Sequence, residues 1–169
     1  YLSLGKADFR TAGDNDVAIA RTDAQGQFSL PALLPSPKLV AVHESGYAEI
    51  VFDDLTTSGK AVLQPWGRIE GVLRFGTKPA PDQEIMVTQR SYGAGDLNFD
   101  FNVFKTRTDD QGRFTFTYVP PGEHQLVRLI SRGDRSWTHS HNQRIRVKAG
   151  QPTEVTYGGT GRPIIGKVV

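Results

Sequence analysis

A ten-residue phrase occurs twice in this chain of 169 residues, as RTDAQGQFSL over residues 21–30 and as RTDDQGRFTF over residues 107–116. Six of the ten positions are identical, at a constant offset of 107 − 21 = 86 residues. An offset of that size is the length of a small domain. The duplication therefore predicts two copies of one module in tandem.

Within each copy, the pattern Asp-x-x-Gly predicts a tight turn. The carboxylate of Asp23 or Asp109 can accept hydrogen bonds from backbone amides two residues on, and Gly26 or Gly112 can supply a positive φ. A cation bound by the two Asp residues is the functional alternative. Because an isolated Asp in a turn usually caps its own backbone, we interpret the phrase as scaffold.

The Phe that follows each turn, Phe28 or Phe114, is expected to open a strand and to face the core. Short runs rich in Val, Ile, Phe and Thr recur between Gly and Pro residues, and their apolar side chains alternate. The runs lie at 17–21, 39–43, 68–75, 84–89, 97–103, 113–119, 124–130, 144–148 and 153–157. Period-two runs bounded by turn residues predict an all-β fold of antiparallel β-sandwiches.

Asp96, Asn98 and Asp100 have the spacing at which a calcium-binding loop begins. Such a loop needs Gly at its sixth position and a later Glu, but Phe101 stands at the sixth position. We therefore interpret residues 97–103 as one amphipathic strand, with a weak surface cation site as the alternative.

His139 and His141, at i and i+2, would point to the same side of a strand and could offer two imidazoles to a metal. A third ligand would have to come from His124 or Asp134. The alternative is that they are polar loop residues without a ligand.

Trp137, with Arg135 and Asp134 close by, could stack on a sugar ring. Trp66, in the joint LQPWG, could do the same, although a plug at a module interface is the simpler interpretation.

Composition and motifs argue against several other functions. The formal net charge is +2 and the basic residues are scattered, so nucleic acid is not an expected partner. Cysteine is absent, and neither a Gly-x-Ser-x-Gly elbow nor a glycine-rich phosphate loop is present. No apolar run approaches the length of a membrane span. We expect no enzymatic activity, no cofactor and no membrane insertion.

Three segments together resemble the carboxypeptidase regulatory-like, or transthyretin-like, family of seven-stranded sandwiches. They are GRIEGVLRFGTKPAPDQEIMV at 67–87, TDDQGRFTF at 108–116 and VPPGEHQLVRL at 119–129. His124 stands near where that family usually has an aromatic residue. The resemblance implies tandem Ig-like or transthyretin-like sandwiches and an extracytoplasmic module, in a secreted, periplasmic or cell-envelope protein, that works beside neighbouring domains.

The repeat offset also predicts domain boundaries. Residues 1–64 would form a sandwich that lacks its first strand, and residues 65–158 a complete one. Residues 159–169, TGRPIIGKVV with the preceding Gly, repeat WGRIEGVL of 66–73 with one insertion and would open a further repeat. Because an unpaired sheet edge is a template for an added strand, we expect strand exchange through residues 163–169.

The sequence thus predicts a non-catalytic accessory or spacer module that positions neighbouring domains and contacts protein or glycan. Two alternatives stay open: a carbohydrate-binding module that uses Trp137, and a metal-binding or metalloenzyme module centred on His139 and His141.

Overall fold

The computed structural model describes residues 2–4, 7–9, 20–30, 38–89, 105–133, 136–159 and 165–167. These residues fall into two compact units, one within residues 2–64 and one within residues 65–89 and 105–167. The predicted strand at 97–103 and residues 17–19 of the first predicted run lie outside the described residues.

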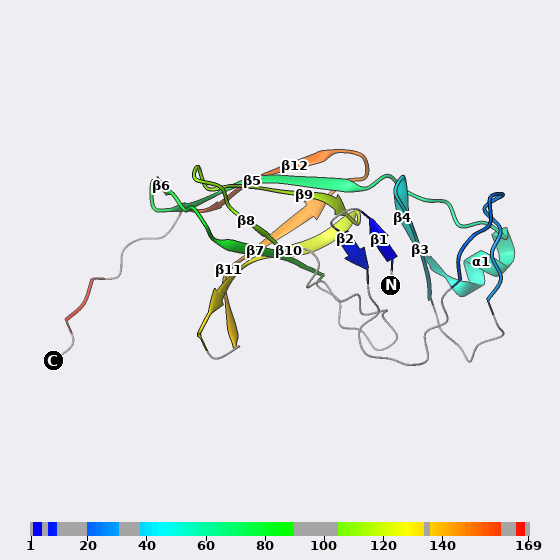
Figure 1. Cartoon of the computed structure of the whole chain (residues 1–169), viewed down its shortest axis with the longest axis horizontal. Coiled ribbons are helices and arrows are strands. Elements are labelled where there is room, and N and C mark those ends of the chain that lie inside the picture. Colours follow the sequence, from blue (N-terminus) through cyan, green and yellow to red (C-terminus); the bar gives the residue numbers. More distant parts are fainter. Residues whose placement is uncertain are drawn as a thin grey trace. The chain divides into compact units, whose positions relative to one another are not determined.

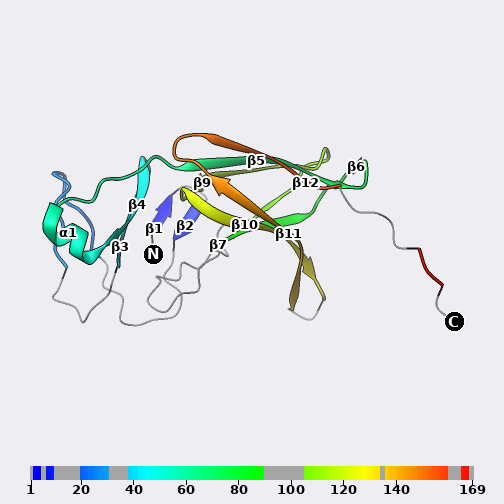
Figure 2. The ribbon, with the colours of Figure 1, turned by 180° about the vertical axis from the view of Figure 1, so that it is seen from behind.

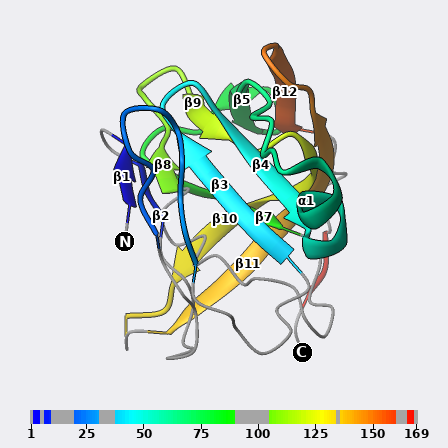
Figure 3. The ribbon, with the colours of Figure 1, turned by 90° about the vertical axis from the view of Figure 1, so that its right-hand side faces the viewer.

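The first unit contains two antiparallel hairpins (Figure 3). Strand β1 (Leu2–Leu4) pairs with β2 (Ala7–Phe9), and β3 (Lys38–His43) pairs with β4 (Gly46–Val51). The helix α1 (Phe52–Ser58) follows β4 and was not predicted from the sequence. It ends at Gly59, which takes φ 62° and donates its N–H to Leu55 O at 2.7 Å.

The second unit is a sandwich of two sheets, seen from both sides in Figures 1 and 2. One sheet is built on β5 (Gly67–Phe75), which pairs with β6 (Lys78–Pro79), β9 (Arg113–Val119) and β12 (Pro152–Gly158). The other has the order β11 (Trp137–Val147), β10 (Gly122–Ser131), β7 (Glu84–Gln89) and β8 (Lys105–Arg107).

The all-β fold class predicted from the sequence is confirmed. One detail is wrong, because β12 runs parallel to β5 rather than antiparallel. The alternation of apolar residues in a strand is the same for both directions, so the sequence pattern does not distinguish them.

Inward-facing side chains of both sheets make the core of the second unit. The fully buried members include Ile69, Leu73, Ile85, Val87, Val119, Leu126 and Tyr157. The Tyr157 hydroxyl donates to Ser140 O at 3.1 Å, and this bond ties β12 of one sheet to β11 of the other. Burial of this alternating set supplies the main favourable free energy of the unit.

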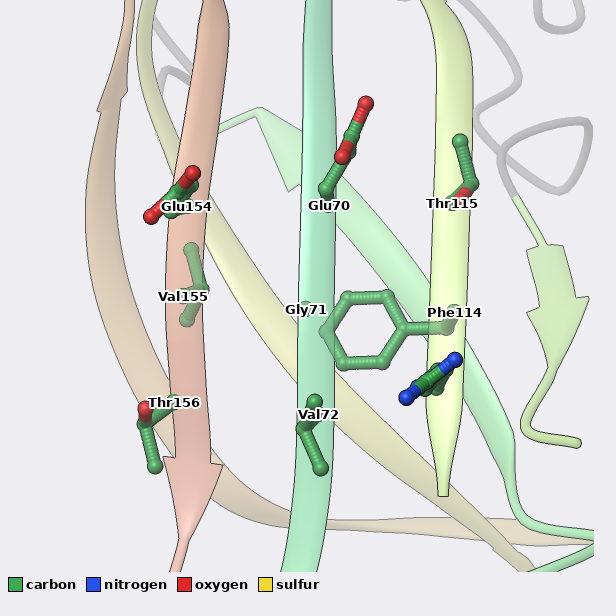
Figure 4. A pocket seen from close by; sticks show the side chains of 9 residues that line it. Glu70, Gly71, Val72, Phe114, Thr115, Glu154, Val155 and Thr156 are labelled. Carbon is green, nitrogen blue, oxygen red and sulfur yellow. The ribbon is translucent and has the colours of Figure 1, made fainter. Parts of the chain in front are cut away.

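Gly71 and Phe114 make the closest approach in this core. They are opposite each other in the antiparallel β5–β9 pair, and the Phe114 ring lies across Gly71 (Figure 4). A Cβ atom at position 71 would overlap the ring. Phe114 is 4% exposed and meets Tyr157 edge to face, with 6.3 Å between ring centroids. The ring is therefore covered by a strand that has no side chain at that point.

The turn that leads to Phe114 is held by the carboxylate before it. Asp109 Oδ1 accepts the backbone N–H groups of Gln111 and Arg113 at 2.9 and 2.8 Å. Gly112 takes φ 72° and donates its N–H to Asp109 O at 2.8 Å.

The first copy of the turn has the same hydrogen bonds. Asp23 Oδ1 accepts from Gln25 N and Gln27 N at 2.9 and 2.8 Å. Gly26 has φ 78° and donates to Asp23 O at 3.0 Å.

The expectation that Phe28 opens a strand and faces the core is wrong. Residues 27–30 are not in a strand, and Phe28 is 38% exposed. The physical reason is that the described part of the first unit has no counterpart of β5. The turn forms by itself, whereas burial of the Phe ring requires the opposing strand.

Candidate functional site

The outer face of the sheet β11–β10–β7–β8 carries the exposed aromatic residue that the sequence singled out. Trp137, the first residue of β11, is 50% exposed, whereas Trp66 is 9% exposed and packs edge to face on Tyr118. His139 is exposed two residues further along β11. Among the described side chains, this half-exposed indole is well suited to stack on a flat ligand.

Lys105 from the opposite edge strand reaches the same indole. Its Nζ lies 5.2 Å from the Trp137 ring centroid and 3.8 Å from Oε1 of Glu84. Strands β10 and β7 lie between β11 and β8, so the two side chains span the face from both edges. The ammonium group of Lys105 thus lies within reach of both the indole ring and the Glu84 carboxylate.

The side of the sheet that carries Trp137 and Lys105 also contains apolar residues. Met86, Val127 and Leu129 form a buried cluster, and they alternate with Ile85 and Leu126, which face the sandwich core. Strands buried on both faces are unusual in an antiparallel sheet. No local sequence pattern indicates that Lys105 contacts both Trp137 and Glu84, because these contacts depend on strand order.

The structure places the His pair in a strand rather than in a loop. The pairing of β10 with β11 shifts register between Leu126↔Gln143 and Arg128↔Ser140, which is a β-bulge at residues 141–142. A bulge interrupts the alternation that the His-x-His argument assumed. The backbone of His141 lies within β11 at this bulge, and nothing is described of its side chain.

His124 cannot be the third ligand for His139. It faces the core with Leu126, whereas His139 is opposite Leu129 on the outer face of the same sheet. Among the residues that the structure describes, no group of three or more His, Asp or Glu side chains could hold a metal ion. Asp134 and Arg135 lie outside the described residues, and so do Asp96, Asn98 and Asp100.

A shallow depression lies on the second sheet, over β12, β5 and β9 (Figure 4). Glu154 and Glu70 are directly opposite each other in the β12–β5 pair, and Glu70 Oε1 pairs with Arg68 Nε at 2.6 Å. Two facing carboxylates repel, so this surface favours a cationic or hydrogen-bond-donating contact. No aromatic side chain stands outward beside them in this depression.

His124 is a buried titratable residue whose pKa is shifted by its surroundings. It is 3% exposed, and its Nε2 lies 2.7 Å from Pro120 O. Because a carbonyl oxygen only accepts, Nε2 carries the proton, and Nδ1 has no hydrogen-bond partner within the described residues. Burial lowers the pKa of His124, and the hydrogen bond to Pro120 opposes this effect. The imidazole is held neutral as a core side chain.

Two tyrosines are also perturbed, again by burial. Burial raises the pKa of Tyr47 and of Tyr157, and Glu49 adds to the effect at Tyr47. Each hydroxyl donates a structural hydrogen bond, from Tyr47 to Glu49 at 3.2 Å and from Tyr157 to Ser140. The two perturbed hydroxyl groups thus serve packing within their own units.

No protein-family model and no curated protein matches the chain. Among solved structures, it is similar to a candidate carbohydrate-binding protein from Pseudomonas aeruginosa, with 13% identity and a TM-score of 0.38 over 56% of this chain and 88% of that one. The group B streptococcus pilus 2b backbone protein gives 13% identity and a TM-score of 0.41, over 73% and 53%. The major pilin subunit of Bacillus cereus gives 14% and 0.37, over 70% and 36%. The chain thus spans about half the length of the streptococcal pilus protein and about a third of the length of the Bacillus cereus pilin.

No helix in the described ranges is long and apolar enough to cross a membrane.

His124 should make the second unit sensitive to acid. The unfolded imidazole titrates near pH 6.5, and the folded one titrates lower, so the unfolded state binds the proton first. The free energy of unfolding should therefore be undiminished above about pH 6.5 and should fall below it, by up to about 1.4 kcal/mol per pH unit from this group. Urea unfolding of the wild type and of His124→Phe at several pH values measures the difference, since other titrating groups are common to both. Parallel curves of stability against pH would show that His124 is not held neutral.

Proposed function

We propose that this chain is a non-catalytic accessory or spacer module of a larger secreted or envelope-associated protein. It holds neighbouring domains at a set spacing and offers a sheet face for contact with protein or glycan. The connection between its two units is the observation that carries this proposal.

In that connection, a single residue separates two residues that are each hydrogen-bonded within their own unit. Gln64 exchanges two backbone hydrogen bonds with Tyr47 of the first unit, each of 2.9 Å. Trp66 is buried in the second unit, and its carbonyl accepts the N–H of Gly150 at 3.1 Å. Only Pro65 stands between them, and the proline ring fixes its own φ. So short a linker suits a spacer whose domains turn little about each other at this joint.

The candidate polar side chains hydrogen-bond to the protein's own backbone, which supports a structural role for them. Asp23 and Asp109 are engaged by backbone amides, and His124 is engaged by Pro120. The resemblance of residues 67–87, 108–116 and 119–129 to the carboxypeptidase regulatory-like family adds the expectation of an extracytoplasmic location beside other domains.

The spacer proposal predicts a restricted joint. The chain has no cysteine, so Cys substituted for Glu44 and Asp110, one exposed residue in each unit, would carry the only two spin labels. Their distance distribution, measured by pulsed electron paramagnetic resonance, should be narrow, because one residue, Pro65, separates Gln64 and Trp66, which are each hydrogen-bonded within their own unit. Insertion of six Gly and Ser residues before Pro65 should broaden it. An equally broad distribution in both proteins would contradict the spacer role.

A second candidate function, glycan binding, is favoured by the Trp137 face. Its half-exposed indole stands beside Lys105 and Glu84, and a sugar ring could use the indole for stacking and the charged groups for hydrogen bonds. The chain contains two tryptophans, and the other, Trp66, is buried.

Glycan binding predicts that chito-, cello- and xylo-oligosaccharides change the fluorescence of Trp137. A binding sugar should also shield it from acrylamide quenching, while the emission of buried Trp66 stays constant. Trp137→Ala should abolish the response, and Trp66→Phe should keep it. No spectral change with any of these sugars at millimolar concentration would remove this second function for the three glycan classes.

A further inference from the structure

Arg128 is an arginine of the second unit whose charge has no carboxylate partner within the described residues. It lies on the inner side of β10, since it is opposite the fully buried Ile85 of β7. Its guanidinium is partly buried, and Cζ lies over the ring of Phe75 at 4.7 Å from the ring centroid. Arg68 and Arg107, in contrast, each pair with a carboxylate. A partly buried guanidinium without a counter-charge favours the binding of an anion.

A hydrogen bond fixes the direction of this guanidinium. Its Nε donates to Oε1 of Gln83 at 2.8 Å. Gln83 is itself held in place, because its Nε2 donates to Pro81 O at 2.8 Å and its backbone N–H donates to Oγ1 of the buried Thr108 at 2.9 Å. The terminal nitrogens Nη1 and Nη2, which we call the Arg128 fork, make no hydrogen bond within the described residues. Their N–H donors therefore remain available to a ligand.

The Arg128 fork lies at the end of the sandwich where β5 ends. Phe75 is the last residue of β5, follows the buried Leu73 on the inner side of the strand and is 41% exposed. Lys78 is exposed and is opposite Phe75 in the β5–β6 pair, so a second cation stands on the same side of this hairpin. The site thus combines two positive charges with exposed aromatic surface.

A carboxylate is the anion that suits this arrangement. A guanidinium can donate two parallel N–H···O bonds to the two oxygens of a carboxylate, and these bonds are charge-assisted. Contact with Phe75 and the bond to Gln83 set the position of the Arg128 fork before a ligand arrives. Because Arg128 already covers that face of the Phe75 ring, a sugar ring cannot stack on it. A carboxylate on a methylene stem, as in a Glu or Asp side chain, can enter beside the ring.

We propose that the Arg128 fork binds the carboxylate of a Glu or Asp side chain from a protein partner. The methylene stem of the partner's side chain packs beside Phe75, and Lys78 adds attraction at longer range. Arg128 is on the inner side of β10, whereas Trp137 and His139 pair with Ser131 and Leu129 on the outer side. The carboxylate site is therefore a contact point separate from the Trp137 face, and it does not depend on glycan binding.

Nuclear magnetic resonance of the full chain tests the proposal through the Nε–H signal of Arg128. The probes are the blocked peptide acetyl-Gly-Gly-Glu-Gly-Gly-amide, the same peptide with Gln in place of Glu, and sodium glucuronate. The Glu peptide should shift the signal with a dissociation constant in the millimolar range. The uncharged Gln peptide should bind at least about tenfold more weakly, and glucuronate should bind more weakly than the Glu peptide.

Two Arg→Lys variants keep the net charge and separate the Arg128 fork from general attraction. Arg128→Lys replaces a planar fork by a point charge, so its affinity for the Glu peptide should fall at least about tenfold. The matched control, Arg113→Lys at an exposed residue of β9, should bind within about threefold of the wild type. Gln83→Glu places a carboxylate of the chain itself beside Arg128 and should abolish binding. Backbone amide signals of Phe75 report binding in every variant, and circular dichroism checks that each variant is folded.

Four results would overturn the proposal. They are equal binding of the Glu and Gln peptides, no shift of the Arg128 Nε–H signal at about 20 mM Glu peptide, equal affinities of Arg128→Lys and Arg113→Lys, and undiminished binding by Gln83→Glu. Tighter binding of glucuronate than of the Glu peptide would contradict a protein partner and assign the site to an acidic glycan.

Discussion

The contact between Gly71 and the Phe114 ring is the constraint on which the second unit depends. The ring can lie flat across β5 because Gly71 has no side chain, and this places Phe114 against Tyr157 in the core. Tyr157 in turn bonds across to β11 through Ser140. One glycine therefore makes room for the Phe114 ring, and Tyr157, which packs on that ring, connects both sheets. The Asp109 turn delivers the ring to this place but does not cover it.

A comparison of the two Asp-x-x-Gly turns explains which features the sequence could predict and which predictions were wrong. The turns at Asp23 and Asp109 depend on local side-chain to backbone bonds, so a short phrase is enough to specify them. Burial of the following Phe depends on a strand far away in the sequence. The prediction that the Phe faces the core was therefore right for Phe114 and wrong for Phe28. The helix α1 was missed because its seven residues, FDDLTTS, are too few to show a helical period.

The candidate surfaces also combine features that the local sequence indicates with features that depend on strand pairing. The sequence singled out Trp137, and the structure leaves it half exposed, while Trp66 is buried against Tyr118. Lys105 and Glu84 join Trp137 through the order of four strands, and no local pattern encodes that order. Regular alternation would place His139 and His141 on one side of β11, but the bulge at 141–142 interrupts that alternation. Bulges depend on pairing between strands and not on either strand alone.

A glycine opposite the Phe closes this module, and the unfolding free energies of two Gly→Ala variants measure how much the module depends on it. Gly71→Ala should lower the unfolding free energy by about 1–3 kcal/mol, since its new methyl group overpacks against Phe114. Gly166→Ala introduces the same methyl group where nothing lies within 4 Å, and it should leave the stability unchanged. If Gly71→Ala were as stable as the wild type, the ring would not depend on the missing side chain, and the account would be contradicted.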